Sequence, residues 1–196
     1  MRKPLVVFAG RSNVGKSSTI RALTGKKVRI GKKPGSTRWE FMIDLGAVTL
    51  VDIPGFGYMA GISKTDIEEM KITIIRKLED WSDDLVLGVL IIDVSLFRQL
   101  VTRWEKRDEI PIDIEFYTFL SEIASKVVVV ANKVDKLKRK EKLSEIEYLR
   151  VKLLEALPEK QPIIVPVSAA KKTGIMELRT AIERVLSEEG LYDLYW

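Results

Sequence analysis

The 196-residue sequence predicts an α/β fold in which six strands form a mostly parallel sheet with helices on both faces. Three observations carry this prediction. Short apolar runs, typical of strands buried on both faces, alternate with segments whose apolar residues recur every three or four positions. One further run alternates apolar and polar residues, as an edge strand does. The segments that follow the strands carry glycine and polar side chains, and an open α/β sheet places its functional loops there.

The expected strands begin with an apolar run near the N-terminus. In chain order they span residues 5–9, 39–45, 48–51, 85–92, 127–131 and 163–167. Phe41 and Ile43 alternate with Met42 and Asp44, which marks the second strand as the edge strand. Residues 45–47 are expected to form a tight hairpin into the third strand. The other runs are continuous and apolar, so helices are expected to cover both of their faces.

The expected helices lie between these strands. Their apolar stripes cover residues 67–81, 112–123, 143–157 and 175–185, and a further helix follows residue 17. Ser63 and Asp66 are placed to cap the entry to the first stripe. The segment 95–110 is assigned no helix. Because strands and helices alternate along the whole sequence, residues 1–196 are expected to form one domain.

Residues 10–17, Gly-Arg-Ser-Asn-Val-Gly-Lys-Ser, follow the first strand and lead into a helix. This is the context of a phosphate-binding loop, because glycines let the backbone approach phosphates and successive N–H groups then face the negative charge. Lys16 is expected to reach the β- and γ-phosphates, and the Ser17 hydroxyl to ligate magnesium. A simple turn before a helix is the alternative. The candidate phosphate-binding residues are Gly10, Arg11, Ser12, Asn13, Val14, Gly15, Lys16, Ser17 and Ser18.

Two further segments fit the phosphate end of such a site. Asp52 ends a strand where its carboxylate can hold a magnesium-bound water, and the Gly55 N–H can meet the γ-phosphate. Thr37 is the best candidate for a second magnesium hydroxyl, although its segment is also compatible with a turn. The loops near 24–38 and 53–63 are expected to be mobile switch segments that the γ-phosphate orders. The candidate catalytic residues are Lys16, Thr37 and Gly55, and Gly35, Ser36, Ile53 and Pro54 complete the candidate contacts.

Asn132, Lys133 and Asp135 follow the fifth strand and indicate the base. Guanine presents N1–H and an exocyclic amine as paired donors, which the Asp135 carboxylate can accept together, whereas adenine presents no such pair on that edge. Asn132 can tie this loop to the phosphate loop, and the Lys133 stem can cover a face of the base. An ordinary strand-end turn with a solvated charge cluster is the alternative.

Ser168, Ala169 and Ala170 follow the sixth strand and fit a last nucleotide loop. A backbone N–H of this loop can meet the guanine oxygen. The same residues are equally compatible with a helix N-cap near Gly174. Taken in chain order, the loops predict a site for GTP or GDP with Mg²⁺.

The composition restricts compartment and chemistry. There is no cysteine, which excludes disulfides and thiolate metal sites, so a cytoplasmic setting is expected. There is also no histidine, the commonest general base. No apolar run is long enough for a signal peptide or a membrane span, so a soluble protein without a membrane partner is expected. A monomer is favoured, although the sequence does not define the oligomeric state.

Positive charge is concentrated in the first part of the chain. Residues 1–39 contain no acidic side chain and 11 Lys and Arg, whereas the remainder contains 22 basic and 28 acidic side chains. A triphosphate needs only a few cations, so the excess predicts a docking surface for RNA phosphates, with a merely solvated basic loop as the alternative. A second basic cluster at 136–140 either extends this surface or keeps the protein soluble.

The motifs together resemble those of the EngB (YihA) family of GTPases. The residues that point to this family are Asn13, Lys33-Pro34-Gly35-Ser36-Thr37-Arg38, Asp52-Ile53-Pro54-Gly55-Phe56-Gly57-Tyr58 and Asn132-Lys133-Val134-Asp135. The resemblance covers nearly the whole chain and implies a Ras-like fold, GTP hydrolysis with magnesium, and a role in ribosomal subunit assembly. The segment 95–110 is longer than the usual pattern, so partner contacts there are not carried over.

Two residues bear on the rate of hydrolysis. Phe56 stands where the familiar G-protein arrangement has a glutamine that orients water, so slow intrinsic hydrolysis is expected, with water held by backbone groups, an ion or a partner. Asn13 matches an asparagine that binds potassium in similar GTPases, where the cation offsets developing charge, although it can instead only hydrogen-bond within its loop.

Three functions are therefore compared. The first is a GTPase switch that docks on assembling ribosomal RNA. The second is a GTP-binding docking module for RNA or protein with little turnover, and the third, an ATP-dependent P-loop enzyme, is disfavoured by Asp135. The aromatic segment 191–196 is expected to pack onto the body, with an exposed partner patch as the alternative.

Overall fold

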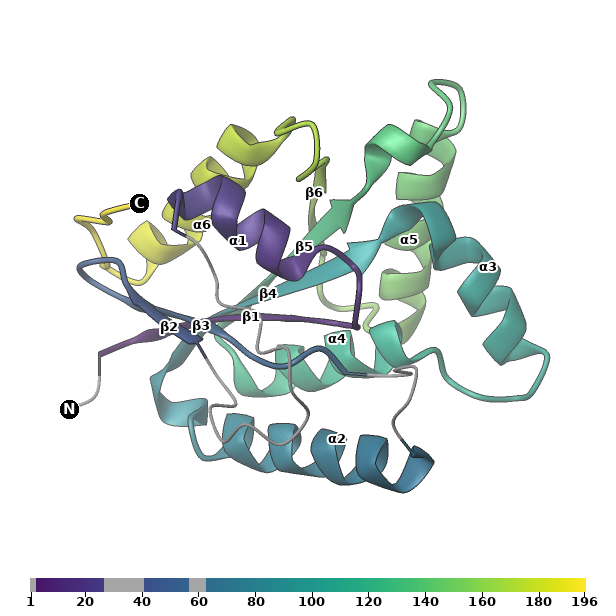
Figure 1. Ribbon diagram of the computed structural model, residues 1–196, viewed down its shortest axis with the longest axis horizontal. Helices are drawn as coiled ribbons and strands as arrows, with labels where there is room; N and C mark the ends of the chain where they lie inside the picture. The colour runs from purple at the N-terminus through teal and green to yellow at the C-terminus, as the bar shows by residue number, and fades with distance from the viewer. Residues whose placement is uncertain (1–2, 27–40, 57–62) are drawn as a thin grey trace.

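The computed structural model describes residues 3–26, 41–56 and 63–196, and these contain a six-stranded sheet in the order β2-β3-β1-β4-β5-β6 (Figure 1). The strands are β1 (Leu5–Gly10), β2 (Phe41–Asp44), β3 (Thr49–Asp52), β4 (Leu85–Asp93), β5 (Lys126–Asn132) and β6 (Ile163–Val167). β2 pairs antiparallel with β3, and every other pairing is parallel. The predicted α/β fold with a mostly parallel sheet is therefore confirmed.

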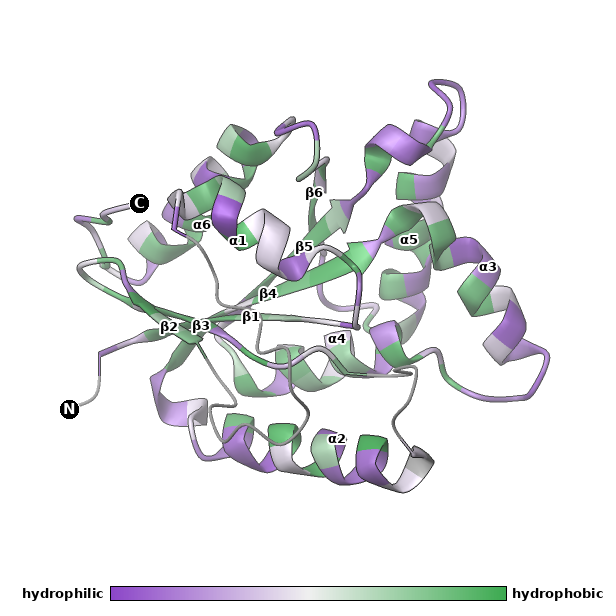
Figure 2. Ribbon diagram, viewed as in Figure 1, coloured by the Kyte–Doolittle hydropathy of each residue, from purple (hydrophilic) through white to green (hydrophobic). Residues whose placement is uncertain are grey.

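Helices cover both faces of this sheet. They are α1 (Lys16–Thr24), α2 (Lys64–Glu79), α3 (Val94–Glu105), α4 (Ile112–Ile123), α5 (Lys142–Ala156) and α6 (Ile175–Glu188). α1 and α6 pack on one face, and α2, α3, α4 and α5 pack on the other (Figure 1). Figure 2 shows that the central strands are hydrophobic along their length, whereas the helices alternate between hydrophobic and hydrophilic residues.

Side chains of one strand enter two separate cores because successive residues of a strand point to opposite faces. Val6 and Phe8 of β1 pack with α1 and α6, whereas Val7 and Ala9 pack with the helices of the opposite face. The edge strand behaves as its alternation predicts: Ile43 is buried and Met42 is exposed. Helices packed on both faces therefore support the loops at the carboxyl edge of the sheet.

The helix α3 is the element that the sequence did not predict. It begins directly after β4, with the Asp93 side chain accepting a hydrogen bond from the Ser95 N–H at the N-cap. Val94, Phe97 and Val101 lie on its buried face, at the spacing of a helix. This short apolar stripe follows the strand without an intervening loop. In the sequence it therefore cannot be distinguished from the apolar run of the strand. The longer α2 begins as predicted, with the Ser63 side chain accepting from the Asp66 N–H.

The C-terminal segment packs onto the body, as predicted. The Tyr195 N–H donates to the Leu45 carbonyl over 2.9 Å, next to the β2–β3 hairpin. The Trp196 indole N–H donates to Glu183 Oε1 of α6 over 2.7 Å. The side chains of Tyr192 and Tyr195 remain exposed. Within the described part of the chain, no helix is both long and apolar enough to span a membrane.

Candidate functional site

The loops that carry the predicted motifs meet at the carboxyl edge of the sheet. The loop after β1 contains residues 11–15, the loop after β3 contains residues 53–56, and the loops after β5 and β6 begin at residues 133 and 168. Because β1, β3, β5 and β6 run in the same direction, all four loops emerge at one edge. The motifs, although far apart in the sequence, are thus brought together.

The phosphate-loop candidate closes tightly onto its neighbours. Gly15 adopts a left-handed conformation, with φ of 96°, at the N-cap of α1, and a Cβ there would clash with the Asn132 side-chain amide. The Ser12 N–H donates to the Phe56 carbonyl over 3.1 Å. A Cβ on Gly55 would lie 3.0 Å from Ser12 N. The backbone of this loop is therefore packed so closely that side chains are excluded on two sides.

Lys16 and Asp52 form a buried ion pair at the phosphate end of the site. Burial raises the pKa of the Asp52 carboxyl, and the positive charge of Lys16 opposes this rise. The sequence analysis assigned Lys16 to the β- and γ-phosphates and Asp52 to the magnesium ion. In this arrangement Lys16 holds the carboxylate beside the first turn of α1.

The residues at this end fit a magnesium ion that is shared with phosphates. Ser17, in the first turn of α1, offers a hydroxyl, and Asp52 offers carboxylate oxygens, and these are the hard ligands that Mg²⁺ prefers. Among the described residues there is no group of three or more acidic side chains that could hold a metal by themselves. An ion here would therefore depend on phosphate oxygens for the rest of its coordination. Gly35, Ser36 and Thr37 lie outside the described residues.

The guanine-loop candidate is tied to its two neighbours through Asn132. The Asn132 side-chain amide donates to the Val14 carbonyl over 2.8 Å, which confirms the predicted link to the phosphate loop. Its side-chain oxygen accepts from the Ala169 N–H over 3.1 Å. Asn132 is 2% exposed. One buried side chain therefore fixes the relative positions of three loops.

Asp135 is exposed and held by the loop after β6. The Ser168 hydroxyl donates to Asp135 Oδ1 over 2.5 Å, and this hydrogen bond is the main cause that lowers the pKa of the Asp135 carboxyl. The positive charges of Lys171 and Lys136 lower it further. The carboxylate is therefore ionised at neutral pH and acts only as a hydrogen-bond acceptor. Ser168 also accepts from the Lys171 N–H, over 3.1 Å, as an N-cap does.

Three residues next to the site were not found from the sequence. Asp93, at the end of β4, pairs with Lys133. Asp113, in the first turn of α4, lies 3.6 Å from Arg11 of the phosphate loop. Phe116 stacks on Phe56. Asp93 ends a strand at the functional edge and could have been found by that criterion, whereas Asp113 and Phe116 lie inside an ordinary helical stripe.

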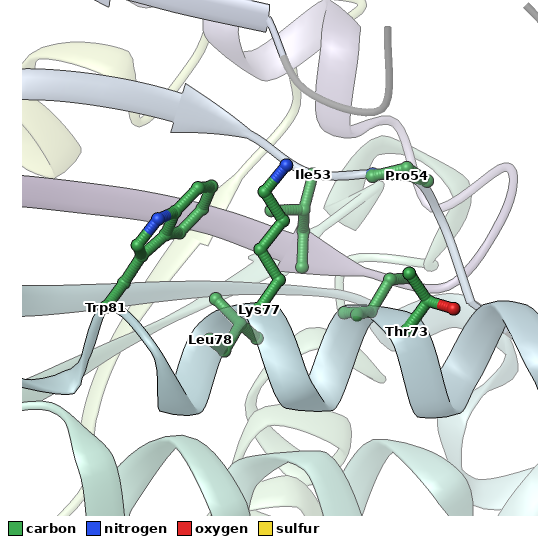
Figure 3. A pocket seen from close by; sticks show the side chains of 7 residues that line it. Ile53, Pro54, Thr73, Lys77, Leu78 and Trp81 are labelled. Atoms are coloured by element: carbon green, nitrogen blue, oxygen red, sulfur yellow. The ribbon is translucent and has the colours of Figure 1, made fainter. Parts of the chain in front are cut away.

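A shallow groove beside the site lies between the loop after β3 and α2. It has a volume of about 70 Å³, and Ile53 points toward the helix (Figure 3). This volume is well below that of sites for drug-sized ligands. Ile53 and Pro54 line this groove together with Trp81, which lies just after the C-terminus of α2.

Part of the N-terminal positive charge is neutralised within the fold. Arg11 lies beside Asp113, and Lys16 beside Asp52, so both cations face a carboxylate of the protein itself. Six of the 11 cations of residues 1–39 lie outside the described residues, namely Arg2, Lys27, Arg29, Lys32, Lys33 and Arg38. By contrast, the basic side chains of the cluster 136–140 are all exposed at the guanine-loop end of the site.

Comparisons with known proteins agree with this architecture. Residues 5–133 match the family model described as a 50S ribosome-binding GTPase. The chain is similar to the probable GTP-binding protein EngB of Pyrococcus horikoshii, with 42% identity over 183 residues, 93% of this chain and 84% of that protein. It is similar to the EngB protein of Methanosarcina barkeri, with 38% identity over 192 residues, 97% of this chain and 91% of that protein.

A solved structure gives the same result. The crystal structure of a probable GTP-binding protein engB superposes with a TM-score of 0.83 at 40% identity, over 94% of this chain and 99% of that chain. The structure of Aquifex aeolicus Era bound to GDP and AlF4− matches with a TM-score of 0.62 at 27% identity, over 93% of this chain and 56% of that chain. Sequence, family model and fold coincide, and the chain belongs to the EngB family of GTP-binding proteins.

Proposed function

We propose that this protein binds GTP with magnesium, hydrolyses it to GDP and phosphate, and uses the exchange as a conformational switch in ribosomal subunit assembly. The single observation that carries the proposal is the arrangement of Asn132, Ser168 and Asp135. Asn132 fixes the loops, and the Ser168 hydroxyl holds an ionised Asp135 carboxylate at the edge of the site. An ionised acceptor suits the two donors of guanine and repels the ring nitrogen that adenine presents there.

At the phosphate end the roles divide between three side chains. Lys16 would neutralise the β- and γ-phosphates, and Ser17 and Asp52 would hold the magnesium ion, Asp52 through water. Magnesium supplies positive charge to the phosphate oxygens. The Gly55 N–H, in the segment packed on Ser12, donates to the γ-phosphate. Thr37 is proposed as the second hydroxyl ligand, and Gly35 and Ser36 as its neighbours in contact with the nucleotide.

The attacking water needs a group other than Phe56. The Phe56 side chain is 2% exposed, so it reaches no water in the site. Backbone groups, a partner, or a potassium ion bound by Asn13 are left to stabilise the developing charge. Asn13 is exposed and has a left-handed φ of 68°, at the outer face of the phosphate loop. Slow intrinsic turnover that an ion or a partner stimulates follows from this arrangement.

The proposed partner is a ribosomal subunit, contacted through RNA phosphates. Two features support it: the description of the matching family as a 50S ribosome-binding GTPase, and the exposed cations of 136–140 beside the guanine loop. Association through such cations weakens with salt, because counterions are released on binding. The absence of cysteine supports a cytoplasmic location.

A second function is favoured by the burial of Phe56, namely a GTP-binding docking module with little turnover. Multiple-turnover phosphate release, measured with and without ribosomal subunits, separates the two. The switch predicts release that the subunits stimulate. The docking module predicts tight GTP binding without stimulated release. Competition of ATP against GTP for the site tests both functions, since equal binding of ATP contradicts each of them.

A further inference from the structure

Asp93 is a buried carboxylate with a defined partner on each oxygen. It is the last residue of β4 and lies in register with Asn132 of β5, so the sheet itself places it beside the guanine loop. Its Oδ2 accepts from Lys133 Nζ over 2.7 Å. Its Oδ1 accepts from the Ser95 N–H over 3.2 Å and from the Ser95 hydroxyl over 2.6 Å. The carboxylate is thus held from α3 on one side and holds Lys133 on the other.

Lys133 crosses the phosphate loop. Its backbone has a left-handed φ of 67°, and its Nζ donates to the Asn13 carbonyl over 2.5 Å as well as to Asp93. Its Cε lies 4.0 Å from the position that a Cβ on Gly15 would occupy. A free lysine side chain loses rotamer entropy when it is held in one conformation. Two acceptors at the tip, one of them charged, offset this cost.

The far side of Asp93 is itself anchored. α3 is bound to α5 by the Arg98 guanidinium, which donates to Glu145 over 2.9 Å and lies 3.8 Å from the centre of the Tyr148 ring. Ser95, in the first turn of α3, is therefore a fixed donor to Asp93. The carboxylate has little freedom to follow Lys133, so it sets the position of the lysine and not the reverse.

We propose that Asp93 is a positioning residue for guanine-nucleotide binding, which acts by holding Lys133 across the phosphate loop with its stem presented to the base. The inference rests on the proposed function, because it takes Lys133 as the side chain that covers the base. A helix N-cap alone needs only one oxygen of Asp93, so the second oxygen on Lys133 is what separates this role from a structural one.

The variant Asp93→Asn tests the proposal with little change to the helix. Asparagine is as good an N-cap as aspartate, so its side-chain oxygen can still accept from Ser95. The charge opposite Lys133 is lost, and an amide replaces the second oxygen. Fluorescent mant-GDP is the probe, measured by titration and by chase with unlabelled GDP. We expect the dissociation constant to rise about tenfold or more, with faster dissociation.

A double-mutant cycle with Lys133→Met decides whether Asp93 acts through the lysine. If it does, Asp93→Asn changes the affinity of the Lys133→Met protein by less than about twofold. Effects that multiply in the double variant would overturn the proposal. Ser95→Ala is the matched control. It removes one hydrogen bond to Asp93 but keeps the negatively charged Asp93 carboxylate opposite Lys133. A loss as large as that of Asp93→Asn would assign the effect to the helix start and also overturn it.

Two further controls make the result interpretable. Thermal unfolding of each variant without nucleotide shows whether the variant is folded. If Asp93→Asn does not fold, Asp93→Ser replaces it, because serine keeps a capping hydroxyl but is too short to reach Lys133. Wild-type protein that fails to bind mant-GDP would contradict the proposed function itself. If the wild type binds mant-GDP but the effects of Asp93→Asn and Lys133→Met multiply, only the role of Asp93 is contradicted.

Discussion

The ring of Phe56 stacks on the ring of Phe116, with centroids 4.0 Å apart and planes inclined by 21°. Phe116 belongs to α4, so this contact places the Phe56 ring in the core that α4 covers. The side chain that stands at the water-orienting position of familiar G proteins is thus a packing residue here. We expect its contribution to be to stability and not to the chemical step.

Replacing Phe56 with alanine separates these two contributions. The loss of a buried ring and its stacking partner is expected to lower the free energy of unfolding by about 3–5 kcal/mol, as for other large-to-small core substitutions. Basal phosphate release per folded molecule should change little. Denaturant unfolding and a steady-state phosphate assay measure the two quantities. Phe116→Ala is the control, since it removes the same contact from the other side, and a collapse of turnover in Phe56→Ala with the fold intact contradicts the prediction.

Asp113 is expected to make stability depend on pH. Its pKa is raised to about 6, chiefly by burial and also by the charge of Asp93, and Arg11 only partly opposes these two causes. The unfolded carboxyl titrates near 3.8, so between about pH 4 and 6 the folded protein retains a proton that the unfolded chain has released. Stability from this group is therefore lost as the pH rises through that window.

The variant Asp113→Asn isolates this effect because asparagine resembles the protonated acid and does not titrate. Its stability relative to the wild type should increase from pH 4 to pH 6, by up to about 3 kcal/mol, and then stay level. Urea unfolding of both proteins at several pH values gives the difference between their free energies of unfolding. The titration of all other groups is common to both proteins and cancels in this difference. A difference that is constant between pH 4 and 8 would contradict the raised pKa.

Gly15 and Gly25 offer a matched pair at the two ends of α1. Both have positive φ, but a Cβ on Gly15 meets the Asn132 side chain, whereas a Cβ on Gly25 meets nothing within 4 Å. Gly25→Ala should therefore cost only the strain of a left-handed alanine, about 1–2 kcal/mol, and leave GDP affinity unchanged. Gly15→Ala should displace Asn132 and lower that affinity at least tenfold. Calorimetric titration with GDP checks this, and equal affinities of the two variants would refute it.

Asp135→Asn should change which base the protein accepts. The amide presents hydrogens where the carboxylate presents only acceptors, so guanine loses its paired acceptor and xanthine, which has an oxygen in place of the amine, gains a donor. Affinities for GTP and xanthosine triphosphate, measured by competition, should shift in opposite directions. Retention of GTP preference by the variant would mean that another group reads the base.

Turnover should depend on the monovalent cation if Asn13 holds potassium. Phosphate release in potassium should then exceed release in sodium at the same ionic strength, and Asn13→Ala should abolish the difference. The sodium rate of the variant serves as the reference, because it reports any change unrelated to the cation. Equal rates of the wild type in the two salts would leave Asn13 with only a role within its loop.

Much of the fold was predictable because its signals are local. Continuous apolar runs located the strands to within one or two residues, and β6 agrees at both ends, Ile163–Val167. The helix α3 escaped because its stripe begins at Val94, immediately after the last residue of β4. A period of 3.6 cannot be read when only three apolar positions follow a strand without a turn between them.

The site divides in the same way. The sequence predicts Lys16, Asn132 and Asp135 as site residues because each belongs to a short motif with fixed spacing at a strand end. Asp113 was not predicted, since it lies inside an ordinary helical stripe, and Asp93 was missed although it ends a strand at the same edge of the sheet. Lys133 is 40 residues from Asp93 in the chain.

By itself, the sequence determined the order of the strands and of every helix except α3, and it predicted the nucleotide motifs, because neighbouring residues specify both. Only the tertiary structure decided that Phe56 lies in the core against Phe116, that Asp113 is buried beside Arg11, and that Asp93 holds Lys133. These outcomes depend on which surfaces lose water when distant segments pack, and no local pattern contains that information.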